Sequence, residues 1–156
     1  MAQNTIEGVK TKPLKWLRDD RGRLMEMIRC DEEFFGGFGQ VYVTVVNPGV
    51  VKGWHFHKLQ DDSFVPLAGA VRVGLYDARE DSPTKGVVAE YLLQSDNPMA
   101  LKIPRGVVHG FECMSETEAM VLNLPNVPYN HKQPDELRIH PFENDIPFKW
   151  NARRGG

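Results

Sequence analysis

The sequence predicts an all-β protein built as a sandwich or barrel of short strands. Its β-branched and aromatic segments are short and recur at regular spacing, which is typical of antiparallel folds. The segments between them, such as QSDNP, MSETE and NVPYN, are rich in turn formers, and 14 Gly and 11 Pro supply many further corners. Helical periodicity is scarce, so we expect few short helices: one turn at Asp31–Phe35 and another at Pro141–Asp145.

The expected strands follow one another along the middle of the chain. The first, Gln40–Val46, reads QVYVTVV and ends at the turn signal Asn47-Pro48-Gly49. The others are Trp54–His57, Phe64–Leu67, Ala70–Tyr76, Val87–Leu93, Ala100–Ile103, Val107–Cys113 and Ala119–Leu124. We expect a single domain over residues 1–156, with residues 1–18 as a peripheral arm and residues 151–156 as a peripheral tail.

Composition and charge argue against several classes of protein. The chain carries 19 Lys and Arg against 21 Asp and Glu, so it lacks the broad basic surface of a nucleic-acid binder. Its apolar runs are too short to cross a membrane, and the N-terminal MAQNTIEGVKTK has no apolar signal region. Cys30 and Cys113 cannot form a disulfide framework and are expected as reduced thiols. We therefore expect a cytoplasmic protein that binds neither nucleic acid nor membrane.

Three of the five histidines lie where their rings can meet inside one barrel. His55 and His57 are two residues apart in an expected strand, so they point to the same face. His109 follows a Pro/Gly corner at the start of another strand. With the Asp62 carboxylate, these imidazoles can ligate Zn, Fe, Mn or Ni and leave one position open. The alternative is that the histidines are hydrogen-bonded barrel residues without a metal.

The spacing of Gly49, His55-Phe56-His57, Asp62 and Gly69 resembles the first motif of the cupin superfamily, and Pro104–His109 resembles the second. The resemblance implies a cupin double-stranded β-helix, or jelly roll, with a site in the barrel mouth. Two departures count against a metal site: Asp62 stands where the superfamily usually has Glu, and Cys113 stands where Asn is common.

A longer series of segments carries a more specific resemblance. In chain order these are Asp20-Arg21-Gly22, Glu26, Gln40, Lys52–Phe56, Asp77–Gly86 and Ile103–Phe111. Together they resemble the dTDP-4-dehydrorhamnose 3,5-epimerase family of cupin-fold enzymes. The resemblance implies an epimerase or isomerase that moves a proton next to the C4 carbonyl of a 4-keto-6-deoxy sugar nucleotide. It also implies that the enzyme needs no metal or other cofactor and works as a homodimer.

The same resemblance assigns roles to individual residues. His55 is the base, and Lys52, where the family usually carries Arg, stabilises negative charge on the sugar or enolate. Histidine suits the task because its ordinary pKa lies near neutrality. His57 or Asp62 is the expected partner of the base, a hypothesis that rests on spacing. The expected substrate-binding residues are Arg21, which is expected to act across a dimer interface, Glu26, Gln40 and His109.

The chain also departs from the family pattern. Leu122 takes the place of a Tyr that is the proposed acid on the opposite face of the sugar, and the family's C-terminal Asp that orients the base has no counterpart. The stretch His55-Phe56-His57-Lys58 resembles the sugar-nucleotide 3,4-ketoisomerases, which work on one face and need no opposing Tyr. Two other functions stay open: a non-catalytic sugar-nucleotide binding cupin, and a metal-dependent cupin enzyme using His55, His57, Asp62 and His109.

Overall fold

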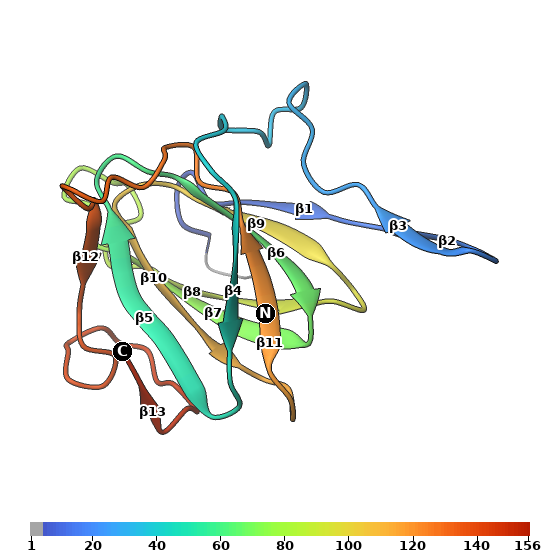
Figure 1. The fold of residues 1–156 in the computed structure, drawn as a ribbon. Coiled ribbons are helices and arrows are strands. Elements are labelled where there is room, and N and C mark those ends of the chain that lie inside the picture. Colours follow the sequence, from blue (N-terminus) through green and yellow to red (C-terminus); the bar gives the residue numbers. More distant parts are fainter. Residues whose placement is uncertain (1–4) are drawn as a thin grey trace.

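The computed structural model describes residues 5–156, and its strands form two facing sheets, antiparallel except for one short C-terminal strand, and one projecting hairpin (Figure 1). The five-stranded sheet has the order β1-β9-β6-β11-β4. Its strands are β1 Lys10–Pro13, β9 Met99–Ile103, β6 Asp62–Ala68, β11 Ala119–Asn123 and β4 Tyr42–Val46. The six-stranded sheet has the order β12-β5-β10-β7-β8, and β13 also pairs with β5. Its strands are β12 Glu136–Arg138, β5 Val50–His57, β10 Val107–Cys113, β7 Ala70–Asp77, β8 Val88–Gln94 and β13 Arg154–Gly155.

The main hydrophobic core lies between these two sheets. Val46 and Phe64 enter it from the five-stranded sheet, and Leu75 and Phe111 enter it from the six-stranded sheet. Residues two apart on a strand share a face, so each sheet turns one set of side chains inward to this core. The arrangement confirms the predicted all-β jelly roll.

The predicted helical turns are wrong, because residues 5–156 contain no helix. In the first region, Glu32 Oε1 accepts hydrogen bonds from Arg29 N and from Lys12 Nζ. In the second region, His140 Nδ1 accepts hydrogen bonds from the backbone nitrogens of Phe142 and Glu143. Side chains that bond nearby backbone groups compete with helical hydrogen bonds, which explains why both segments form turns. The structure accordingly has no helix within these residues that is long and apolar enough to cross a membrane.

The two ends of the chain are more closely attached to the barrel than we predicted. Residues 1–4 of the expected arm lie outside the described residues. Ile6, however, is part of the core, and β1 pairs with β9 at the edge of the five-stranded sheet. At the other end, β13 pairs with β5, and Trp150 packs against Trp54 at a ring-centroid distance of 4.6 Å.

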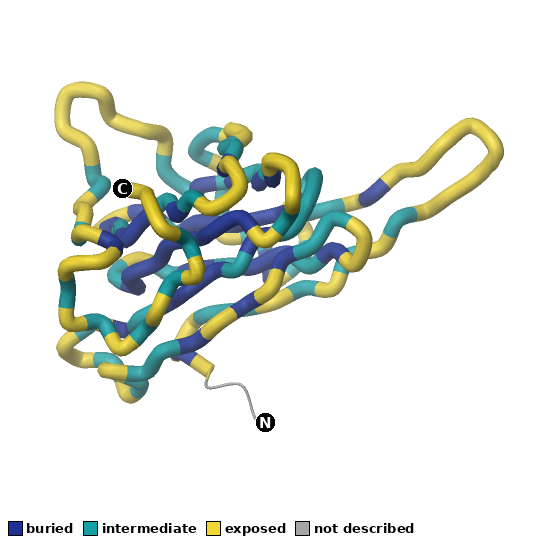
Figure 2. Tube along the Cα trace, turned by 90° about the horizontal axis from the view of Figure 1, so that it is seen from below, coloured by how far each residue is buried: buried dark blue, intermediate teal, exposed yellow. Residues whose placement is uncertain are grey.

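The element that does project is the hairpin of β2 (Trp16–Asp19) and β3 (Gly22–Met25), which extends away from the barrel in Figure 1. Figure 2 shows that the residues at its far end are exposed. The cross-strand pair Leu17 and Leu24 exposes 55% and 61% of its surface. The hairpin therefore presents apolar side chains that nothing in residues 5–156 covers.

Candidate active site

Strands β5 and β10 bring the rings of His55 and His109 into edge-to-face contact. The two residues are direct partners in the antiparallel ladder, and their ring centroids are 4.2 Å apart. Gly53 and Gly110 lie next to this pair, and a Cβ on Gly53 would come within 2.6 Å of the Gly110 Cα. Gly53 also has a φ of 134°, which side chains rarely allow, so glycine is needed here for the two strands to approach.

Asp62 forms the centre of a buried polar cluster behind His55. Its Oδ2 lies 3.3 Å from the Nε2 atoms of both His57 and His109, and only 1% of the residue is exposed. Its Oδ1 accepts hydrogen bonds from Gln60 Nε2 and Asn123 Nδ2, both at 2.7 Å. Burial works to raise the pKa of Asp62, but the interactions with the histidines and Asn123 outweigh it and hold the pKa at about 2. Asp62 is therefore a carboxylate at neutral pH.

Backbone contacts fix which ring nitrogens face the carboxylate. His57 Nδ1 donates to the Asp135 carbonyl at 3.2 Å, and His109 Nδ1 donates to the Val107 carbonyl at 3.0 Å. Both Nε2 atoms are thereby turned toward Asp62. The negative charge is balanced either by a proton on one Nε2 or by a cation held among these groups.

The three histidines have the spacing of a possible metal site. One ring nitrogen from each of His55, His57 and His109 lies within 4.8 Å of the others. The contact between His109 Nε2 and Asp62 Oδ2 is 3.3 Å long but is not aligned as a hydrogen bond, so Nε2 could serve as a metal ligand or carry a proton. The three histidines of the predicted set His55, His57, Asp62 and His109 therefore lie close enough to share an ion, whereas Asp62 is close to His57 and His109 only. The cluster fits equally well a site in which protons alone balance the charge.

His55 faces a cavity of about 630 Å³ that opens at the barrel mouth. Burial and repulsion from His109 lower the pKa of His55 well below its ordinary value, so its imidazole is neutral at physiological pH. Lys52, three residues earlier on β5, lines the same cavity, and its Nζ donates to Thr44 Oγ1 at 3.0 Å. A neutral base and a positively charged side chain thus face the same cavity. This pair suits proton removal next to a carbonyl group.

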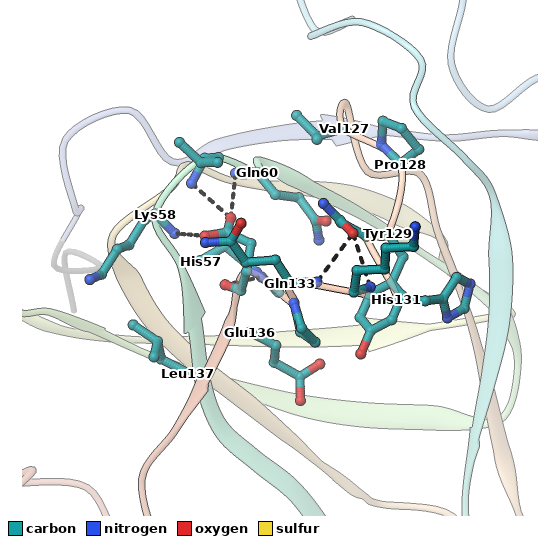
Figure 3. Close-up of a pocket in the computed structure, with 15 residues that line it drawn as sticks. His57, Lys58, Gln60, Val127, Pro128, Tyr129, His131, Gln133, Glu136 and Leu137 are labelled. Carbon is teal, nitrogen blue, oxygen red and sulfur yellow. Dashed lines mark hydrogen bonds between the residues drawn. The ribbon is translucent and has the colours of Figure 1, made fainter.

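A second cavity, of about 920 Å³, lies beside the loop that precedes β12 and is drawn in Figure 3. It is lined by His57 and by the loop that precedes β12, and Glu136 borders both cavities. In that loop, the Asp135 carboxylate accepts hydrogen bonds from the backbone nitrogens of Lys58, Leu59 and Gln60. The loop is therefore tied to the end of β5 next to the histidine cluster.

None of the four predicted binding residues lines the His55 cavity within one chain: His109 belongs to the buried polar cluster, and the other three lie elsewhere. Arg21 lies at the turn of the projecting hairpin and pairs with Asp19. Glu26 follows that hairpin and pairs with Arg29. Gln40 accepts a hydrogen bond from the backbone nitrogen of Tyr129, so within the chain it supports the loop before β12.

Leu122 is not at the cavity, contrary to what the sequence pattern suggested. It packs on the outer face of the five-stranded sheet, against the cluster of Met25, Phe34, Val65 and Ala100. The residue of β11 that points inward at this end is Asn123. Strand β11 therefore offers no side chain that could act as a proton donor to the sugar carbon, because Leu122 points away from the cavity and Asn123 carries an amide.

Sequence reasoning missed several residues that line the cavity. Tyr42, Thr44, Glu136, Arg138 and His140 are the polar members of this set. Tyr42 and Thr44 had one usable signal, since they alternate with valines and share a strand face with Val46. The residues of β12 had none, because their three-residue strand pairs with β5 only through the tertiary fold.

Comparisons with known proteins agree with this geometry. Residues 3–154 match the family model described as dTDP-4-dehydrorhamnose 3,5-epimerase. The chain is 44% identical to the spore coat polysaccharide biosynthesis protein SpsL of Bacillus subtilis, covering 94% of this chain and 97% of that protein. It is 34% identical to the solved dTDP sugar isomerase of Desulfovibrio desulfuricans G20, with a TM-score of 0.87 and coverage of 93% and 92%.

A second similar structure carries a bound sugar nucleotide. The 3,5-epimerase RmlC of Legionella pneumophila, solved with dTDP-4-keto-L-rhamnose, is 26% identical, with a TM-score of 0.80 and coverage of 97% of this chain and 85% of that one. The family match spans nearly the whole barrel, including every strand that builds the histidine cavity. The chain belongs to the dTDP-4-dehydrorhamnose 3,5-epimerase family.

Proposed function

We propose that this chain is an epimerase or isomerase of a nucleotide-linked 4-keto-6-deoxy sugar, acting by proton transfer at the carbon next to the C4 carbonyl. The observation that carries the proposal is the neutral, half-buried imidazole of His55 facing the same cavity as Lys52. A C–H next to a ketone is a weak acid, so its removal needs a neutral base and a positive charge near the enolate oxygen. The dTDP sugars named for the similar proteins indicate the substrate class.

In this proposal His55 is the base and Lys52 stabilises the enolate. His57, His109 and Asp62 form the polar cluster behind the base, with Asp62 close to both of the other rings. The Asp62 carboxylate stabilises positive charge in this cluster once His55 takes up a proton.

The test is isotope exchange in deuterated water with dTDP-4-keto-6-deoxyglucose. Wild-type protein should introduce deuterium next to the carbonyl, and His55→Asn should slow that exchange by roughly a thousandfold. His131→Asn is the matched control, because His131 lies on the loop before β12 and does not line the His55 cavity. Tight binding with no deuterium in the sugar would instead favour the non-catalytic alternative.

We also propose that the protein is a homodimer in which the β2–β3 hairpin of one subunit reaches the cavity of its partner. The exposed Leu17 and Leu24 pair supports this, and so does the position of Arg21 outside its own chain's cavity. Light scattering should give twice the chain mass of 17.7 kDa for the wild type. A Leu17→Glu, Leu24→Glu double variant should be monomeric, and a monomeric wild type would contradict the proposal.

A cytoplasmic location is part of the same proposal. Two free cysteines, Cys30 exposed and Cys113 buried, are compatible with a reducing compartment. Fractionation of cells that make the protein checks this point.

A further inference from the structure

Tyr42 stands on the wall of the cavity that faces His55. Tyr42 belongs to β4 in the five-stranded sheet, whereas His55 belongs to β5 in the six-stranded sheet, and both line the same cavity. We propose that Tyr42 is the acid that delivers a proton to the sugar from the face opposite His55. This inference rests on the proposed function, and it assigns to β4 a role that no residue of β11 can fill.

The strand pattern determines where Tyr42 points. Val46 on β4 is fully buried in the core between the sheets. Thr44 and Tyr42 lie two and four residues before it and therefore share its inward face. The contact between Lys52 and Thr44 shows that this face of β4 meets β5 across the cavity.

Asn123 holds the phenol in place. It is the direct ladder partner of Tyr42, and its Nδ2 donates to the Tyr42 hydroxyl at 2.9 Å. The same Nδ2 donates to Asp62 Oδ1, while Asn123 Oδ1 accepts from the backbone nitrogen of Ser63. These bonds fix the amide, so the Tyr42 oxygen accepts one hydrogen bond and keeps its own O–H to donate.

Other groups on this wall are poorer acids. Thr44 carries an aliphatic hydroxyl, which is a far weaker acid than a phenol, and it already accepts from Lys52. Phe64 has no proton to give. Burial raises the pKa of Tyr42, with the Asn123 hydrogen bond acting in the opposite direction, so the phenol stays protonated at neutral pH.

The proton balance closes without any further reactant. His55 takes the proton from the carbon and leaves an enolate, and the Tyr42 O–H bond then breaks as a new C–H bond forms on the other face. The phenolate accepts a hydrogen bond from Asn123 and regains a proton from water, which can reach a residue that is 43% exposed. His55 returns its own proton to solvent, and the carbon is inverted.

The experiment compares inversion with isotope exchange in deuterated water, using dTDP-4-keto-6-deoxyglucose as the probe. In Tyr42→Phe, inversion should fall by roughly a hundredfold or more, while exchange with retained configuration falls far less. A purely structural effect would lower both rates together. Tyr76→Phe is the matched control, since Tyr76 lies on β7 and does not line the cavity.

The outcomes separate this inference from the proposed function. If Tyr42→Phe has the same ratio of inversion rate to exchange rate as the wild type, the role of Tyr42 is overturned, and His55 remains the base. A wild-type protein that shifts the ketone without inverting a carbon would also overturn it. No exchange by the wild type at all would overturn the proposed function itself.

Discussion

His57 Nε2 lies 3.3 Å from Asp62 Oδ2, and neither side chain is more than 9% exposed. We expect Asp62→Asn to destabilise the protein by roughly 2 kcal/mol at pH 7, because the pKa of Asp62 is held near 2 in the fold and is about 4 in an unfolded chain. Urea denaturation measures the difference, with Asp96→Asn on an exposed turn as the control.

The sign of the pH dependence follows from the lowered pKa. The stabilisation is complete above the unfolded pKa and is lost as the pH falls toward the folded pKa of about 2. The gap in unfolding free energy between wild type and Asp62→Asn should therefore shrink below about pH 4. A gap that stays constant from pH 7 to pH 3 would contradict the charge-based account.

We expect kcat/KM to fall as the pH is lowered, and this acid limb of the pH profile should lie below 6.5, the ordinary pKa of histidine. His55 must be neutral to act as a base, and burial lowers its pKa, so activity persists to lower pH than an exposed histidine would allow. The groups that set this environment are His109, Asp62, His57 and Arg138. The profile of kcat/KM between pH 4.5 and 8 measures the limb, and a limb above pH 6.5 would be inconsistent with His55 as the base.

Lys52 should matter for catalysis more than for folding. Lys52→Met should lower kcat/KM by roughly a hundredfold because the positive charge near the enolate is lost. Lys52→Arg keeps the charge and should recover part of the rate. Steady-state kinetics measures the effect, with the exposed Lys15→Met as control, and equal rates for Lys52→Met and wild type would rule out the electrostatic role.

We expect the stability of the loop after β7 to depend on hydrogen bonds to Asp77. This fully buried carboxylate accepts hydrogen bonds from Arg79 Nε at 2.8 Å, from Ser82 Oγ at 2.5 Å and from Thr84 Oγ1 at 2.7 Å. Burial opposes ionisation, but these donors keep the pKa of Asp77 far below its ordinary value. Asp77→Ala should cost roughly 3 kcal/mol of stability, measured by thermal denaturation, whereas the exposed Asp81→Ala should change it little.

Metal content distinguishes the two ways of balancing the charge of the histidine cluster. The epimerase proposal expects protein purified without added metal to contain well below one equivalent of Zn, Fe, Mn or Ni. Dialysis against a chelator should leave isotope exchange unchanged. Elemental analysis makes the measurement, and one tightly held ion per chain whose removal stops exchange would favour the metal-dependent alternative.

The strands that build the barrel could be predicted because burial leaves a pattern in the sequence. All seven residues of Val107–Cys113 are buried, and the predicted bounds of this strand match β10. By contrast, β2 and β3 are mostly exposed, and β12 and β13 are only three and two residues long. Such strands depend on pairing with partners far away in the chain, which local periodicity does not show.

The site was predictable to the extent that it follows strand alternation. His55 and His57 share a face by the period of two, and the structure places His55 beside His109 and His57 beside Asp62. Their meeting with His109 depends on the pairing of β5 with β10, which spacing alone could only suggest. The inward position of Asn123 in place of Leu122 depends on strand register, and β11 shifts register against β6 between Met120 and Val121.

The last residues of the chain border the cavity, since Gly156 lines it and its backbone nitrogen donates to the Val51 carbonyl. A Cβ on Gly155 would collide with the same carbonyl oxygen. An affinity tag fused after Gly156 would thus begin beside the cavity that contains His55. Assays of this protein are better made with the tag at the opposite end of the chain or cleaved away.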